Sequence, residues 1–285
     1  MTRRALHGCL LLSVVGALAA VGTVAAGLPA AEARRRSDEL VTQAQQMSAE
    51  GRSKEARRAV EEALRIAPDN PAARRELAMH LVAEGEAARA VQELRAVAQA
   101  RPYDGGAARE LGAVLGVTGD HKGATEWLRR AVRLEPHNGV AHAMLASQLA
   151  QAGELEAALE AAERGARLAP RVSLTHFVLA LVRWRAGHLQ EAHEALRETQ
   201  RLRPSDPQVI ISLASLAGEL GRHQEAAGHL RQLVELQPDS PEAWAALGAA
   251  LAAAGSPQEA VRAFSRALEL DPANAAARRA LGISE

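Results

Sequence analysis

Histidine is the residue type in this 285-residue chain that most invites a chemical interpretation. Ten histidines are present, and metal binding is the chemistry that they would support. Two ligands on one helix must be three or four residues apart to face the same ion. The closest pairs are separated by five or six residues, namely His137/His142, His188/His193 and His223/His229. The spacing therefore predicts no metal site, and we interpret the histidines as structural or surface residues.

Catalytic motifs are missing from the sequence. It contains no phosphate-binding G-x-x-x-x-G-K-[ST], no dinucleotide-binding G-x-G-x-x-G after a strand, no G-x-S-x-G and no H-E-x-x-H. Glutamates are frequent, as at Glu61, Glu62, Glu191 and Glu194, but they are expected on solvated helix faces. We therefore expect no enzyme, no catalytic residues, no cofactor and no small-molecule substrate.

The charge pattern argues against nucleic acid as a partner. Lys and Arg together number 34, as do Asp and Glu, so the net charge is zero. The short basic clusters at Arg57-Arg58 and Arg129-Arg130-Arg133 are interleaved with acidic residues and lack aromatic residues on which bases stack. These arginines are expected on a solvated face.

Residues 1–33 differ in composition from the rest of the chain. Arg3 and Arg4 precede an uncharged apolar run at 8–31, which ends near Pro29 and the small-residue pattern Ala31-Glu32-Ala33. This order is typical of a cleaved export signal, which places the protein in the periplasm or outside the cell. An uncleaved membrane anchor formed by residues 8–31 is the alternative, because about 20 apolar residues span a bilayer.

A repeat of 34 residues organises the remaining sequence. Glycine occurs at 51, 85, 119, 153, 187, 221 and 255, and proline occurs at 68, 102, 136, 170, 204, 238 and 272. Alanine follows the same period from Ala56 to Ala260. A fixed period of this length is the signature of a repeat array.

Each repeat is predicted to form two helices, as the last one illustrates. Pro241 opens a first helix, Gly255 supplies the turn, and Ser256 is expected to cap a second helix that Pro272 ends. The first helix carries Trp244, Leu247, Gly248 and Leu251 on one stripe, facing Ala260, Phe264 and Ala267 of the second.

This pattern resembles the tetratricopeptide repeat family. The resemblance covers seven contiguous units over 37–274: 37–70, 71–104, 105–138, 139–172, 173–206, 207–240 and 241–274. Residues 275–285 look like a partial capping helix and tail. The resemblance implies an all-α, right-handed α-solenoid of antiparallel helix pairs, whose first helices line a concave groove.

Three units depart from the pattern, and we expect the weakest packing there. The first unit has Gln43-Ala44 where Leu-Gly or Leu-Ala is usual. The fourth unit has Ala162 and Gly165 where larger residues are usual. The fifth unit has Arg183 where four other units carry leucine, and Thr199 at a usual alanine.

The groove is the predicted binding site. In the family, positions 5, 9 and 12 of each first helix line it, which gives Val41/Gln45/Ser48, Arg75/Met79/Val82, Arg109/Ala113/Gly116, Ala143/Ser147/Ala150, Phe177/Leu181/Trp184, Ile211/Ser215/Gly218 and Ala245/Ala249/Ala252. Arg75 and Arg109 occupy the basic position of the family's carboxylate clamp, but Met79 and Ala113 replace its asparagine. We therefore expect the two arginines to engage an acidic segment, without a clamp for a peptide C-terminus.

The bulkiest side chains among these groove positions belong to the fifth unit, at Phe177, Leu181 and Trp184. Ile211 and Ser215 of the sixth unit are beside them. Aromatic residues are only 2% of the chain, so Trp184 calls for an explanation. Either it is an anchor for a bound segment, or it fills space over Ala150 and Gly218 of the neighbouring units.

The sequence thus predicts a non-enzymatic, exported scaffold that binds a protein or peptide in its concave groove. A membrane-anchored assembly or biogenesis factor of a cell-envelope complex is the alternative.

Overall fold

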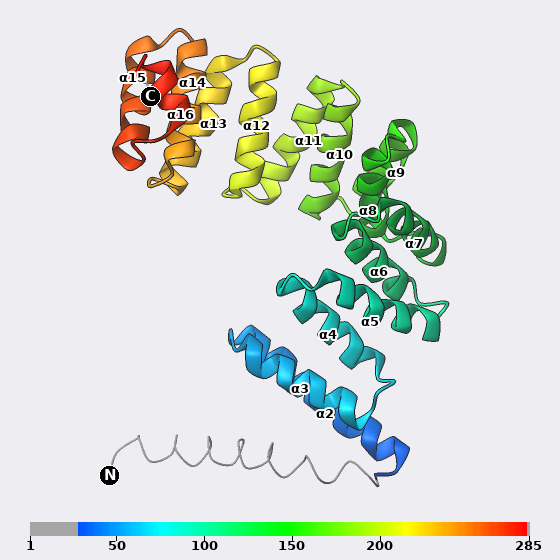
Figure 1. Cartoon of the computed structure of the whole chain (residues 1–285). Coiled ribbons are helices and arrows are strands. Elements are labelled where there is room, and N and C mark those ends of the chain that lie inside the picture. Colours follow the sequence, from blue (N-terminus) through cyan, green and yellow to red (C-terminus); the bar gives the residue numbers. More distant parts are fainter. Residues whose placement is uncertain (1–27, 284–285) are drawn as a thin grey trace, which may run out of the picture. The chain divides into compact units, whose positions relative to one another are not determined.

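The computed structural model describes residues 28–283, which form fifteen α-helices and no strand within that range. The chain divides into two compact units at the boundary between Asp120 and His121. Each unit is built from consecutive helices that run side by side in alternating directions (Figure 1). The all-α class and the paired helices expected from the sequence are thus present.

The first unit contains five of the described helices. They are α2 (Ala30–Ala49), α3 (Ser53–Ile66), α4 (Pro71–Ala83), α5 (Ala87–Ala100) and α6 (Gly105–Val117).

The second unit contains the other ten. They are α7 (His121–Leu134), α8 (Gly139–Gln151), α9 (Leu155–Leu168), α10 (Ser173–Arg185), α11 (Leu189–Leu202), α12 (Pro207–Glu219), α13 (His223–Leu236), α14 (Pro241–Ala253), α15 (Pro257–Leu270) and the short α16 (Ala275–Ala280). A helix of 13 residues and one of 14 residues alternate from α4 to α15.

Side-chain caps fix where the first helices begin. The residue before the helix accepts a hydrogen bond from a backbone N–H of the first turn in α4, α6, α8, α12, α14 and α16, through Asn70, Asp104, Asn138, Asp206, Ser240 and Asn274. Helices α2 and α10 are the exceptions, because Pro29 and Val172 stand at their cap positions.

Helices α3, α5, α9, α11, α13 and α15 begin without such caps, which corrects the role expected for Ser256. Ser256 precedes α15, but its side chain makes no capping hydrogen bond. Gly255 has φ +77°, a left-handed conformation that turns the chain sharply, and the Ser256 N–H then donates to Leu251 O at 2.9 Å. The turn itself therefore positions the second helix.

Small residues bring helices α8 and α9 into backbone contact, contrary to the weak packing expected for the fourth unit. A Cβ on Gly165 would lie 2.9 Å from Gly139 O, and one on Gly139 would lie 2.7 Å from Gly165 O. Ala162 is completely buried beside them. The missing side-chain volume is thus replaced by closer approach of the helices.

The departures in the fifth unit are accommodated by polar contacts. Arg183 lies between Glu163 and Glu191, with N···O distances of 3.5 and 3.7 Å, and its side chain is 21% exposed. The buried Thr199 hydroxyl donates to Ala195 O at 2.9 Å.

The expected export signal or anchor falls mostly on residues 1–27, which lie outside the described residues. Its last part, Ala31–Ala33, belongs to the first turn of α2. The first buried side chain of α2 is Ser37, whose hydroxyl donates to Ala63 O at 2.8 Å. Among residues 28–283, no helix combines the length and the hydrophobicity needed to cross a membrane.

Candidate functional site

The predicted groove residues fall in both units, and each set is described within its own unit. Arg75, Met79 and Arg109 belong to the first unit. Arg75 is bound internally: its Nη2 donates to Asp104 Oδ2 at 2.9 Å, and its Nε lies 2.8 Å from Glu110 Oε2. Its positive charge is therefore already balanced within the chain.

The pKa values of the two carboxyl groups beside Arg75 are shifted in opposite directions. Burial raises the pKa of Glu110, and Arg75 only partly offsets that effect. Burial also acts to raise the pKa of Asp104, but the hydrogen bond from the Ala107 N–H and the charge of Arg75 together lower it. Asp104 is consequently the firmer partner of Arg75.

Met79 and Arg109 differ in exposure. The Met79 side chain is among the most exposed apolar groups of the first unit, at 67%. Arg109 is half-buried, and its Nε has no hydrogen-bond partner within the described residues. The first unit therefore offers an exposed thioether more readily than a free guanidinium.

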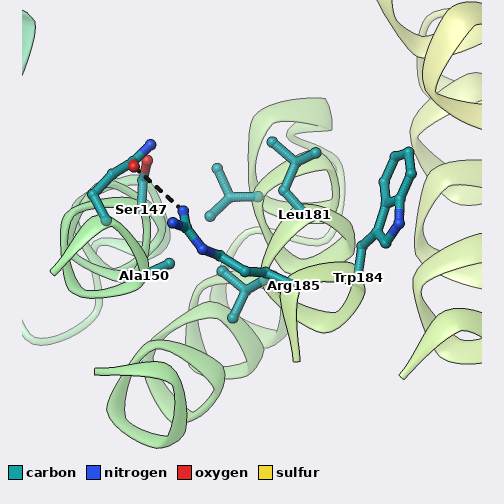
Figure 2. Close-up of a pocket in the computed structure, with 8 residues that line it drawn as sticks. Ser147, Ala150, Leu181, Trp184 and Arg185 are labelled. Carbon is teal, nitrogen blue, oxygen red and sulfur yellow. Dashed lines mark hydrogen bonds between the residues drawn. The ribbon is translucent and has the colours of Figure 1, made fainter. Parts of the chain in front are cut away.

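In the second unit, Leu181 and Trp184 line a cavity between α8 and α10 (Figure 2). The cavity has a volume of about 350 Å³. Ser147 and Ala150 form its α8 side, and Arg185 at its edge donates to Gln151 Oε1 at 3.3 Å. Leu181 is 40% exposed. An apolar wall with polar groups at the edge is typical of a binding surface.

Trp184 is half-buried against the apolar core of the second unit, and its indole Nε1 donates to Glu219 Oε2 at 2.8 Å. Its ring points away from Ala150 (Figure 2). A Cβ on Gly218 would meet no atom within 4 Å, so the ring does not lie over that glycine. The indole reaches Glu219 of the neighbouring helix α12, so part of Trp184 is used for packing within the chain.

Ile211 and Ser215 line a second cavity, of about 430 Å³, between α12, α13 and α14. Both side chains are exposed, Ile211 to 39%. Gly218, Leu230 and Ala246 contribute further apolar wall. Phe177 is half-buried against the core and lines neither of these two cavities.

Part of the predicted stripe is buried in the structure. Val41, Ala143 and Ala245, at position 5 of their helices, are at most 5% exposed. Ala143 lies against Gly165, where α8 and α9 touch. Position 5 therefore serves helix packing in these units, and so does position 12 at Ala150, which is 6% exposed.

His142 and His176, which are 34 residues apart, have the structural role expected of the histidines. His142 Nε2 lies 3.1 Å from Pro136 O, and His176 Nε2 lies 3.0 Å from Pro170 O. Trp244 makes the same contact with the proline of the preceding repeat, donating to Pro238 O at 2.8 Å. A ring nitrogen at this position thus satisfies the carbonyl of the repeated proline.

Three other side chains meet across two helices, which the sequence analysis missed. His193 of α11 and Glu225 and His229 of α13 place their ligand-type atoms within 4.8 Å of one another. Burial lowers the pKa of His229. The spacing of histidines alone does not reveal this cluster, because its i, i+4 pair consists of a glutamate, Glu225, and a histidine, His229. That pair was the available signal.

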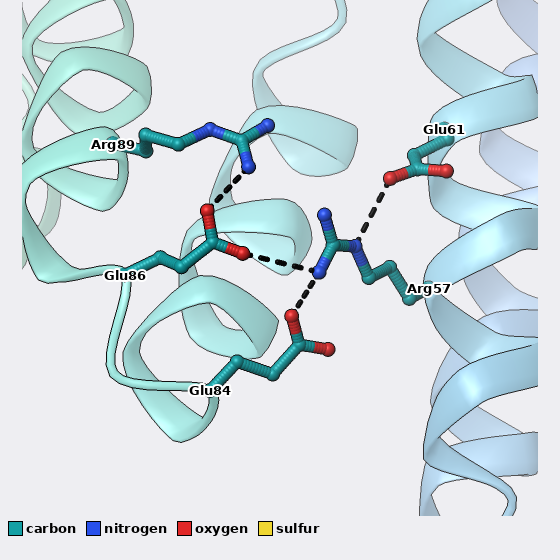
Figure 3. Close-up of polar contacts among 5 residues, drawn as sticks. All are labelled: Arg57, Glu61, Glu84, Glu86 and Arg89. Carbon is teal, nitrogen blue, oxygen red and sulfur yellow. Dashed lines mark hydrogen bonds and ion pairs between the residues drawn. The ribbon is translucent and has the colours of Figure 1, made fainter.

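One arginine of each basic cluster is paired with neighbouring acidic groups. Arg57 pairs with Glu61, Glu84 and Glu86, and Glu86 also pairs with Arg89 (Figure 3). In the second unit, Arg129 pairs with Glu154 at 3.1 Å, and Arg130 lies over the Trp127 ring.

One glutamate on a second helix departs from the expected solvated face. The Glu62 side chain is only 8% exposed and is paired with Arg65. A buried carboxylate needs a charged partner, and Arg65 supplies it. Glu62 therefore belongs to the packed interior of the first unit.

The helices are arranged in pairs, and exposed apolar side chains lie beside open cavities on the first helices α10 and α12. This arrangement is typical of a helical-repeat scaffold. A family model described as tetratricopeptide repeat matches residues 143–207, 211–275 and 250–284, and a second model of that description matches residues 47–115. The chain belongs to the tetratricopeptide repeat family. It is accordingly a scaffold for protein interaction, and proteins of this family are generally non-catalytic.

Solved structures with the same fold support this assignment. A tetratricopeptide repeat protein from Parabacteroides merdae has 13% identity and a TM-score of 0.62, with 87% of this chain and 98% of that one covered. The pilF protein of Pseudomonas aeruginosa has 17% identity and a TM-score of 0.62, with 75% and 97% covered. MamA from Desulfovibrio magneticus has 24% identity and a TM-score of 0.52, with 60% and 97% covered. No curated protein sequence matches the chain.

Proposed function

We propose that the second unit binds a protein segment along its first helices, at the surface formed by Leu181, Trp184, Ile211 and Ser215. The observation that carries this proposal is the exposure of Leu181 and Ile211 beside two open cavities. Large apolar side chains left in water cost free energy that a partner recovers by covering them.

The chemistry of the surface indicates what kind of segment would bind. The segment would place apolar side chains on the centre of the surface and polar groups near its edge. Leu181 and the Trp184 ring offer apolar area, while Arg185 and Glu219 stand at the edge. Such a mixture suits a peptide whose buried anchors are aliphatic or aromatic. Arg75 and Arg109 of the first unit are a separate proposal, a contact with an acidic segment, for which Arg75 would have to exchange its bonds to Asp104 and Glu110.

We also propose that binding at this surface involves no catalysis, cofactor or small-molecule substrate, and no nucleic acid. In support, Arg57 and Arg129 of the two basic clusters are paired with acidic groups, and the two cavities are lined mainly by apolar side chains. Binding would then depend on shape and apolar contact.

A displayed peptide library selected on the whole chain tests the binding surface. The selected peptides are expected to bind Trp184→Ala and Leu181→Ala at least tenfold more weakly, because each variant removes apolar contact area at an interface anchor. Affinity is measured by calorimetry or fluorescence anisotropy.

Arg129→Ala is the matched control, since Arg129 lies on a second helix and pairs with Glu154. It is expected to leave the affinity unchanged. Trp184→Phe keeps an apolar ring and loses the bond to Glu219, so it separates loss of area from loss of that bond. Equal binding by the wild type, Trp184→Ala and Leu181→Ala would contradict the proposed surface.

Export is a separate proposal, supported by the order of charged, apolar and small residues in 1–33. Cell fractionation with N-terminal sequencing is expected to find an exported chain that begins at Arg34. A membrane-bound chain with an intact N-terminus would instead support the anchored assembly factor.

A further inference from the structure

We propose that His193, Glu225 and His229 form a binding site for one divalent transition-metal ion of the Zn²⁺ type, which joins helix α11 to helix α13. Two imidazoles and one carboxylate are a ligand set that Zn²⁺ accepts in proteins, with solvent or a further group at the remaining position. The proposal goes beyond the binding surface on the first helices, because all three residues belong to second helices.

The geometry is close to that of a tetrahedral ion. His193 Nε2 lies 3.1 Å from Glu225 Oε1, and His229 Nε2 lies 3.9 Å from the same oxygen. Ligand bonds of about 2.0–2.1 Å give tetrahedral edges of roughly 3.3 Å. The His193–Glu225 edge already fits, whereas the distance from His229 Nε2 to Glu225 Oε1 must shorten by about 0.6 Å through a change of side-chain torsion. The third edge is at most 4.8 Å.

The two imidazole nitrogens are buried without a partner of their own. The side chains of His193 and His229 are 9% and 10% exposed. Neither Nε2 has a hydrogen-bond partner within the described residues, although both face Glu225. A buried polar atom without a hydrogen bond is costly, and a metal ion would satisfy both nitrogens at once.

Two arginines face Glu225 and compete with a cation for it. Arg197 Nη1 lies 3.5 Å from Oε1, and Arg222 Nη1 lies 3.7 Å from Oε2. Their side chains are 59% and 40% exposed, so each can turn into solvent, and exposed ion pairs of this kind contribute little to stability. Arg197 shares the oxygen that the metal would take, which makes it the stronger competitor.

Zinc titration of the whole chain, prepared without a polyhistidine tag and stripped with EDTA, tests the site. We expect one Zn²⁺ per chain by calorimetry and a visible absorption band when Co²⁺ is the probe. His193→Gln and His229→Gln are expected to weaken Zn²⁺ binding at least tenfold and to remove the Co²⁺ band. His188→Gln is the control, because His188 is exposed and pairs with Glu191 away from the cluster.

Arg197→Gln gives a test that does not disturb a buried residue. Removing this competing charge is expected to tighten Zn²⁺ binding several-fold, whereas a site elsewhere on the chain would not respond. Circular dichroism of the metal-free variants verifies that each is folded. Unchanged Zn²⁺ affinity in Arg197→Gln, or equal affinity in the wild type and the two histidine variants, would overturn the proposal.

Discussion

At the scale of single residues, ring nitrogens satisfy backbone carbonyls between helix pairs. His142 and His176 reach the carbonyls of Pro136 and Pro170, as Trp244 reaches that of Pro238. The repeated proline ends a second helix and leaves its carbonyl without a helical partner. A ring at the fourth position of the next helix supplies the missing donor, which explains why histidine and tryptophan occupy equivalent places.

The burial of His142 predicts a loss of stability in mild acid. Burial lowers the pKa of His142, the bond to Pro136 O opposes that effect, and Arg164 adds to the lowering. The unfolded chain, with a histidine pKa of about 6.5, then binds more protons than the folded one. Stability therefore falls as the pH drops through that value, and the loss ends below the folded pKa.

Thermal unfolding between pH 7.5 and pH 5, in EDTA, measures this effect. His142→Gln is expected to lose less of its Tm over this range than the wild type does. His137→Gln, which alters an exposed histidine, serves as the control. An identical fall in Tm for the wild type and His142→Gln would show that His142 does not contribute.

Arg183 leads to a second prediction at this scale. Its ion pairs with Glu163 and Glu191 are long, while the matching leucines, Leu81 and Leu149, are at most 3% exposed. Replacing a partly buried ion pair by a fitting apolar group is often neutral or stabilising. Arg183→Leu should raise the free energy of unfolding by about 1 kcal/mol, and Arg183→Ala should lower it. Denaturation that finds both variants equally destabilised would contradict this.

At the scale of helices, the backbone φ angle determines whether replacing a glycine by alanine stabilises or destabilises the protein. Gly218 and Gly221 both have open space where a Cβ would be placed, but only Gly221 has a positive φ, of +71°. Gly218→Ala should therefore stabilise α12 by about 0.5 kcal/mol, because alanine favours a helix. Gly221→Ala should destabilise the protein by about 1–2 kcal/mol, because the left-handed conformation is costly for alanine. Chemical denaturation of the two variants tests the pair, and equal signs would refute the explanation.

Helix positions were predictable from the sequence, and helix packing was less so. The repeated glycine and proline place the turns, and α14 begins at Pro241 as expected. The close approach of α8 to α9 was not predictable from side-chain size alone, because Ala162 and Gly165 permit either a gap or contact. Ser256 was expected to cap α15, but the sharp turn at Gly255 leaves its side chain without that bond.

At the scale of the whole molecule, the period of 34 residues specified the family and the all-α fold. It did not specify which side chains of neighbouring repeats would meet. Trp184 and Glu219 are 35 residues apart, and His193 and Glu225 meet across two second helices. The position of a residue within its repeat predicts which face of the helix it occupies. Which side chains of neighbouring repeats come into contact depends on how closely the helices pack.

The most direct test of the central proposal is the position at which a bound peptide cross-links to the chain. A photoreactive residue replaces either Ile211 on α12 or Val261 on α15, two β-branched residues that are 39% and 50% exposed. We predict that a peptide selected on the wild-type chain cross-links at position 211 and does not cross-link at position 261. Cross-linking at position 261 but not at 211 would contradict binding along the first helices.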